Sequence, residues 1–118
     1  MIVDSGLQHM ADQMAEENQA AMSHMAVGTG TNAPAVGDTT LQTELARVAM
    51  TSITRSDKKV TYVATFGPGV GTGALTEAGI LNAASAGDML TRIGFAVKNK
   101  GANDTMTVTI EHTYQRAS

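Results

Sequence analysis

The spacing of hydrophobic residues changes along the chain, from a helical period near the N-terminus to an alternating one further on. Residues 4–22 are rich in helix formers, and their apolar side chains recur three and four positions apart. The apolar face carries Leu7, Met10, Met14 and Ala21. Asp4 or Ser5 can accept hydrogen bonds from the free N–H groups of a first turn. We therefore expect an amphipathic N-terminal α-helix over residues 4–22.

Residues 23–46 carry weaker signals. A short run at 23–27 predicts a strand, and it leads into glycines, threonines and a proline that form turns. Near residues 39–46, Leu41 and Leu45 lie four positions apart, which fits either a short helical turn or a loop. We expect this segment to hold one strand and a Gly-, Pro- and Thr-rich connection.

Beyond residue 46 the period becomes two, which is typical of strands with one buried face. Strands are predicted at 47–55, 60–66, 75–81, 89–97 and 105–114. The polar residues 56–59 between the first two of these predict the turn of a β-hairpin. With the short strand before residue 46, the count is five or six strands.

Alternating strands joined by short turns, with no helix between them, favour antiparallel sheets over a parallel α/β fold. The predicted class is mainly β: an antiparallel β-sandwich or jelly-roll-like barrel with an N-terminal α-helix. We expect one domain over residues 1–118, with its sheet core at 47–115. The predicted core residues share one face of alternating strands: Val60, Tyr62, Ala64, Phe66, Ile93, Phe95, Met106, Val108 and Ile110.

Composition limits how well this core can be filled. The chain is 42% hydrophobic, but only 3% aromatic, so most apolar side chains are small. A lightly filled core in 118 residues is usually supported by disulfides, metals or contacts between subunits. The chain has no cysteine, which excludes disulfides and thiolate sites. We therefore expect self-association.

The charge pattern argues against two classes of partner. The net charge is −3, and the eight Lys and Arg residues form no clustered basic surface of the kind that nucleic acid requires. The sequence also shows no signal peptide and no apolar run long enough to cross a membrane. We expect neither nucleic acid nor a membrane as a partner.

One glycine-rich segment resembles a cofactor loop in its spacing. Gly69, Gly71 and Ala74 match the G-x-G-x-x-A pattern of dinucleotide-binding loops. That pattern requires a buried parallel strand before it and a helix after it. Here the preceding strand alternates with threonine and the following segment is a poor helix, so we expect a connection between strands and no cofactor.

The three histidines offer little chemistry. The spacings of His9, His24 and His112 match no short metal motif, and Glu111 points to the opposite strand face from its neighbour His112. The sequence shows no constellation of a nucleophile, a base and a group that orients the base. We expect no catalytic residues, no metal site and no enzymatic activity.

Four segments carry a resemblance to a known group of proteins. They are residues 26–47 (AVGTGTNAPAVGDTTLQTELAR), 61–66 (TYVATF), 75–82 (LTEAGILN) and 99–108 (NKGANDTMTV). Together they span roughly residues 22–110, and they resemble small structural proteins of tailed bacteriophage virions. The matching segments are turns and strands, so they indicate a class of virion protein more than a single role.

The resemblance implies a non-enzymatic virion protein, most specifically a capsid decoration or cement protein that stabilises the shell. A tail, baseplate or fibre-attachment protein, with a receptor- or carbohydrate-binding role, is the alternative. The expected partners are further copies of the chain, as a trimer, and the major capsid protein or other virion proteins. The helix face with Leu7, Met10 and Met14 is the candidate contact with a subunit or the capsid, although packing on its own sheet is equally compatible.

Overall fold

The computed structural model describes residues 1–15 and 20–114. A single helix and seven strands follow one another in this part of the chain. They are α1 (Asp4–Met14), β1 (His24–Gly28), β2 (Glu44–Ala49), β3 (Ser52–Ser56), β4 (Lys59–Phe66), β5 (Gly73–Leu81), β6 (Met89–Lys100) and β7 (Met106–Thr113).

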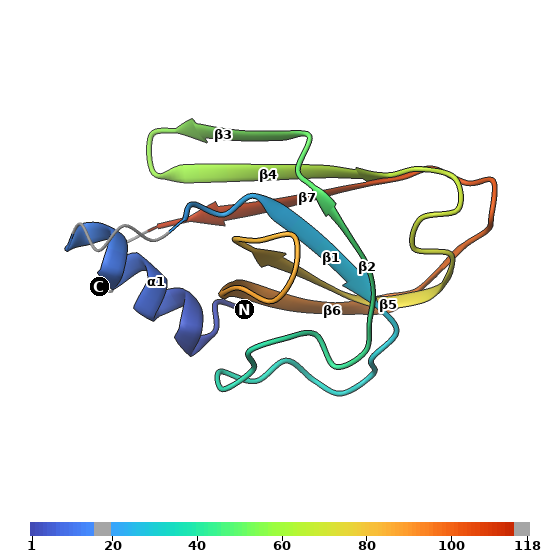
Figure 1. The fold of residues 1–118 in the computed structure, drawn as a ribbon, viewed down its shortest axis with the longest axis horizontal. Coiled ribbons are helices and arrows are strands. Elements are labelled where there is room, and N and C mark those ends of the chain that lie inside the picture. The colour runs from blue at the N-terminus through green and yellow to red at the C-terminus, as the bar shows by residue number, and fades with distance from the viewer. Residues whose placement is uncertain (16–19, 115–118) are drawn as a thin grey trace.

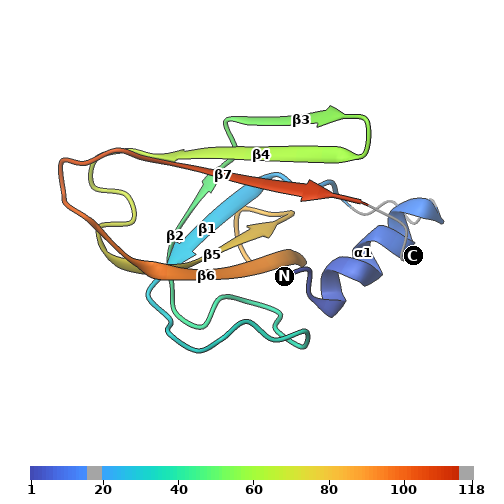
Figure 2. The ribbon, with the colours of Figure 1, turned by 180° about the vertical axis from the view of Figure 1, so that it is seen from behind.

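The strands form two antiparallel sheets that pack face to face (Figure 1). One sheet has the order β2-β1-β5-β6, and the other has the order β3-β4-β7. Helix α1 lies at one end of the sandwich, beside β6 (Figure 2). The predicted mainly β class with an N-terminal helix is confirmed, and the sheets form a sandwich because their strands do not close into a barrel.

Alternating apolar side chains of both sheets fill the space between them. Tyr62, Ala64, Phe66 and Ile110 are buried as predicted. The other predicted core residues pack against this cluster and are partly buried: Val60, Ile93, Phe95, Met106 and Val108. The facing half of the core also contains residues that we did not predict, and these are Met25, Val27, Leu75, Ala78, Ile80 and Leu90.

The predicted strand at 47–55 is wrong in one respect, because it is two strands in different sheets. β2 ends at Ala49 and pairs with β1, whereas β3 begins at Ser52 and pairs with β4. The chain crosses between the sheets at Met50 and Thr51. The apolar positions change from even numbers, Val48 and Met50, to an odd number, Ile53, so the alternation shifts phase at the break. One continuous strand was predicted in spite of that shift.

The segment before residue 47 also differs from prediction. The option of a helical turn at 39–46 is wrong, because this stretch is a loop followed by β2 from Glu44. Leu41 is buried, whereas Leu45 is 46% exposed, so the two leucines do not share a helix face. The sheet core therefore starts before residue 47, and β1 lies inside the four-stranded sheet.

Helix α1 is shorter than predicted. It ends at Met14, residues 16–19 of the predicted helix lie outside the described residues, and residues 20–22 are not helical. The N-cap is Val3, without a side-chain cap, so the predicted capping role of Asp4 or Ser5 is wrong. The Asp4 N–H instead donates to the Val36 carbonyl over 2.7 Å, so a loop satisfies the helix start.

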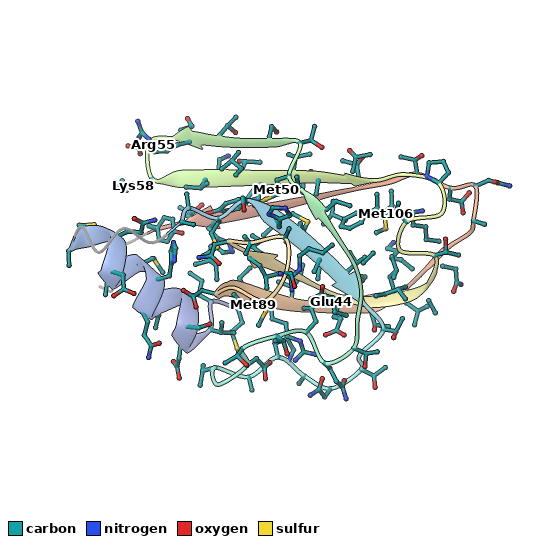
Figure 3. All side chains as sticks on the ribbon, viewed as in Figure 1. Glu44, Met50, Arg55, Lys58, Met89 and Met106 are labelled. Carbon is teal, nitrogen blue, oxygen red and sulfur yellow. The ribbon has the colours of Figure 1, made fainter. Side chains whose placement is uncertain are left out.

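The outer face of the four-stranded sheet carries a third layer. The connection between β1 and β2, residues 29–43, runs across this face (Figure 1). A second apolar cluster lies beneath it, made of Val3, Ala26, Leu41, Leu81 and Met89. Figure 3 shows Met89 on the side of β6 that faces this loop. The loop is thus a packed element of the fold.

Candidate assembly surface

Helix α1 is held firmly against β6. The Ser5 hydroxyl donates to the Met89 carbonyl over 2.7 Å, and the Val3 N–H donates to the Leu90 carbonyl over 3.1 Å. Gly6 is buried, and a Cβ atom at this position would collide with the backbone of Leu90. His9 on the same helix face is 5% exposed. The helix is therefore a rigid support for the side chains on its other face.

The three residues of the predicted contact surface are not all on one face. Met10 points towards the sandwich and packs against its core cluster. Leu7 and Met14 are 55% and 86% exposed, and Ala11 between them is also exposed. Spacings of four and three residues place Leu7, Ala11 and Met14 along one side of the helix. We call these three residues the outer helix stripe.

A buried carboxylate fixes the loop over residues 29–43 to the sheet. Glu77 on β5 is fully buried. Its Oε2 accepts the N–H groups of Gly30 and Thr43 over 2.7 and 2.8 Å, and its Oε1 accepts the Gln42 N–H over 2.9 Å. Both ends of the loop are therefore tied to one side chain. We call Glu77, its charge partner Arg92 and Asp38 the loop clamp.

Arg92 on β6 links Glu77 to the middle of the loop. Its Nε donates to Glu77 Oε1 over 3.0 Å, and its Nη1 donates to Asp38 Oδ2 over 2.8 Å. Its Nη2 donates to Asn32 Oδ1 over 2.7 Å. The guanidinium is 1% exposed, so this charge is matched entirely by groups of the protein.

The hydrogen bonds of the clamp determine its protonation. Burial alone would raise the pKa of Glu77, but the N–H groups of Thr43, Gln42 and Gly30, with Arg92, outweigh burial and lower it. The Ala35 N–H and then Arg92 lower the pKa of Asp38. Both carboxylates are therefore held in the charged form.

We did not predict the clamp from the sequence. Its only signal was one charged residue inside each of two otherwise apolar strands, Glu77 in 75–81 and Arg92 in 89–97. Unlike an exposed charge, a charge at such a position requires a buried partner. Nothing in the spacing indicated which residues would meet it.

The glycine-rich segment connects β4 in one sheet to β5 in the other, and both strands are antiparallel to their neighbours. The prediction of a connection between strands is confirmed. Gly69 and Gly71 have φ of 78° and 69°, which favours glycine there. The Gly69 N–H donates to the Ala102 carbonyl, and Lys100 Nζ donates to the Gly67 carbonyl over 2.8 Å. The segment is thus fastened to the 101–105 turn.

The histidines lie on three different elements. His24 Nδ1 is 2.7 Å from the Ser23 hydroxyl. His112 lies between the rings of Tyr62 and Tyr114, and burial lowers its pKa. Burial, and then Tyr114, raise the pKa of Tyr62 to about 12. Within residues 1–15 and 20–114, no group of three His, Asp or Glu residues could hold a metal ion.

A groove opens on one side of the sandwich, where β6 and β7 are the unpaired edges of the two sheets. Figure 2 shows these strands close together near the 101–105 turn and further apart towards α1. The groove has a volume of about 440 Å³ and is lined mainly by Ile93, Phe95, Met106 and Val108. The label in Figure 3 places Met106 at the narrow end of this side.

Comparisons with known proteins found no match, either among protein-family models or among curated proteins. The helix of the described residues is too short and too polar to span a membrane. The candidate for an assembly surface is therefore defined by geometry alone: an exposed apolar stripe on a fixed helix, free sheet edges among the described residues, and an apolar groove between two of those edges.

Proposed function

We propose that this chain is a non-enzymatic structural protein of a tailed bacteriophage virion, and most specifically a capsid decoration protein on the shell surface. The sequence resemblance suggests the virion. The outer helix stripe is the observation that supports a structural role, because two large apolar side chains point to solvent from a helix that cannot shift easily. Exposed apolar groups on a rigid support are typical of interaction surfaces.

The stripe suits repeated weak contacts. Leu7 and Met14 lie seven residues apart, which is about two helical turns, so they can enter two neighbouring depressions on a partner. Each such contact buries little area. Many copies, or several copies joined together, still hold firmly because one bound contact raises the effective concentration of the next.

The alternative is a tail, baseplate or fibre-attachment protein with a receptor- or carbohydrate-binding role. Sugar rings usually stack on open aromatic faces. Tyr62 and Phe66 are buried here, while Phe95 and Tyr114 are partly buried. This arrangement favours the structural role over the binding role.

The copy number of the chain in purified virions tests the location. Quantitative mass spectrometry should give a ratio to the major capsid protein of order one for a decoration protein. A handful of copies per particle would instead indicate a location in the tail. Complete absence from virions would contradict the proposal.

Aspartate substitutions test whether the outer helix stripe is the contact with the particle. L7D with M14D should fold normally but dissociate from particles, because the charges would have to be buried at the contact. V36D is a control, because Val36 is also 56% exposed but lies on the loop over residues 29–43, outside the helix and the sheet edges. If V36D particles lose the protein and L7D/M14D particles keep it, the helix is not the contact.

A further inference from the structure

The four sheet edges are not equally protected against pairing with another strand. Proteins usually protect edges with short strands, bulges, lysine, proline or a covering segment. β2 and β3 are short, with six and five residues, and each carries an arginine. β6 has two register shifts, carries Lys98, and is partly covered by Met1, which pairs with Arg92.

Within residues 1–15 and 20–114, β7 has none of these protections. It runs for eight residues, Met106–Thr113, and contains no lysine or proline. Its register with β4 is regular from Lys59 opposite Thr113 to Phe66 opposite Met106. Its one acidic residue, Glu111, is already matched by Lys59 over 3.5 Å. Among the edges of the described sheets, β7 is therefore the one best suited to accept another strand.

The free edge of β7 presents a defined set of backbone groups. The Tyr114 N–H donates to the Lys58 carbonyl over 2.9 Å, at the end of the β4–β7 ladder. Along an antiparallel strand, residues that bond to one neighbour alternate with residues whose N–H and C=O face the other way. The backbone groups of Thr107, Thr109 and Glu111 consequently point away from β4 and towards the open side.

We infer that β7 pairs with β7 of a second copy, antiparallel and around a two-fold axis at Thr109. Thr109 then faces the partner's Thr109 as a hydrogen-bonded pair. Thr107 faces the partner's Glu111, and Val108 faces the partner's Ile110. The two three-stranded sheets become one continuous sheet across the axis.

The side chains favour this register. Threonine pairs and β-branched apolar pairs are favourable across antiparallel strands, and like charges directly opposite each other are not. An axis at Thr109 keeps the two Glu111 carboxylates apart, whereas an axis at Glu111 would bring them face to face. The chosen axis also lies near the middle of β7, so residues 106–112 of the two strands pair with one another.

The groove beside β7 explains why a second copy is the occupant. Ile93, Phe95, Met106 and Val108 line it next to the free edge, so each copy brings the same apolar side to the axis. A two-fold contact uses one patch twice, which requires a self-complementary patch. This pairing gives a dimer in place of the trimer that the resemblance implies, and it does not depend on the proposed role in a virion.

Sedimentation velocity over a range of protein concentrations tests the pairing. The wild-type chain should form a species of twice the 12.2 kDa chain mass. T109K places two lysines opposite each other and should weaken the dimer about fivefold or more. T109P removes an N–H that faces away from β4, so it should also weaken the dimer while the chain stays folded.

Mixing charge variants tests the register. T109K and T109E should each dimerise poorly, and a mixture should form a heterodimer because opposite charges then face each other. T54K is the matched control, because Thr54 is an exposed threonine on the other edge strand of the same sheet and should leave the dimer unchanged. Circular dichroism confirms that each variant is folded.

Three results would overturn the inference. These are a monomer at all concentrations, a trimer as the smallest assembly, or a dimer that T109K leaves unchanged. Failure of T109K and T109E to form a heterodimer would contradict the axis at Thr109. None of these results depends on whether the protein is found in virions.

Discussion

Glu77 and Arg92 place a pair of charges on the buried outer face of the four-stranded sheet, where an apolar pair would be the simpler choice. The desolvation cost of such a pair is large, and its net contribution to stability is often small. Its value here is positional, because four donors converge on one carboxylate and fix a loop of fifteen residues, 29–43. An apolar pair of the same volume could not accept those N–H groups.

Removing one charge of the clamp should be costly. E77Q leaves Arg92 buried with a weaker partner, and we expect a loss of about 3 to 5 kcal/mol in the free energy of unfolding. Urea denaturation measures this loss. The double variant E77L/R92M should cost less than the sum of the single changes, and strict additivity would show that the two residues do not act together.

The clamp should also make stability depend on pH. The pKa of Glu77 is lower in the folded chain than its ordinary value of 4.5, and that of Asp38 is lower than 3.8. Their contribution is therefore complete above about pH 4.5 and is lost as the pH falls through the folded-state values. Thermal unfolding from pH 7 to pH 3 should show this loss, and E77L/R92M should show a smaller one.

Phe66 is the best-buried aromatic residue of the core, at 0% exposure. F66A should leave a cavity between the sheets and cost about 3 to 5 kcal/mol in the free energy of unfolding. A variant with the wild-type melting temperature would show that the core face of β4 is misassigned.

At the scale of elements, α1 shows which features of a helix the sequence pattern can predict and which it cannot. Helical spacing predicted its start and its amphipathic character. It could not predict the end at Met14, because the alanines and glutamates that follow also favour a helix. The apolar pattern also left open which face of the helix points inward. In the structure Gly6 and His9 face the sheet, while Leu7 and Met14 face solvent. Close backbone contact selected the smallest residue for the interface, against the apolar pattern.

The contact at Gly6 predicts that replacing this glycine by alanine destabilises the protein, which is the opposite of the usual effect in a helix. Replacing glycine by alanine inside a helix normally stabilises it by about 1 kcal/mol. G6A should instead lower the melting temperature, because its Cβ would collide with the Leu90 backbone. G37A is the control, since a Cβ at Gly37 meets nothing within 4 Å and should leave the melting temperature unchanged or slightly raised.

The positions of the strands could be predicted from the sequence, whereas their assignment to the two sheets could not. Alternation depends on local sequence, so β4, β5, β6 and β7 were found close to their true positions. Sheet membership depends on contacts between distant residues. The alternation shifts phase between β2 and β3 but does not show which sheet each strand joins. The backbone donors to Glu77 lie 34 to 47 positions away along the chain.

At the scale of the whole molecule, the light core predicted from composition is supplemented in two ways. The loop over residues 29–43 adds a second apolar cluster outside the four-stranded sheet. The open side between β6 and β7 leaves apolar lining uncovered in a single copy. The loop thus covers the outer face of the four-stranded sheet, whereas the apolar groove between β6 and β7 stays exposed along one side of the sandwich.

The open side predicts that stability depends on concentration. If β7 pairs between copies, the dimer is favoured by mass action, and the melting temperature should rise with protein concentration. Differential scanning calorimetry at several concentrations measures this rise. T109K should remove it while T54K keeps it, and a concentration-independent melting temperature for the wild-type chain would contradict a stabilising dimer.

The pairing of Met1 with Arg92 sets the order in which the chain can fold during synthesis. The two residues are 91 positions apart, and their bond holds the start of α1 against β6. A ribosome adds roughly 5 to 20 residues per second, so β6 follows Met1 by about 5 to 18 seconds. A helix of eleven residues is marginal on its own in water. The segment that leaves the ribosome before the strands must therefore wait for β6 before it can become stable.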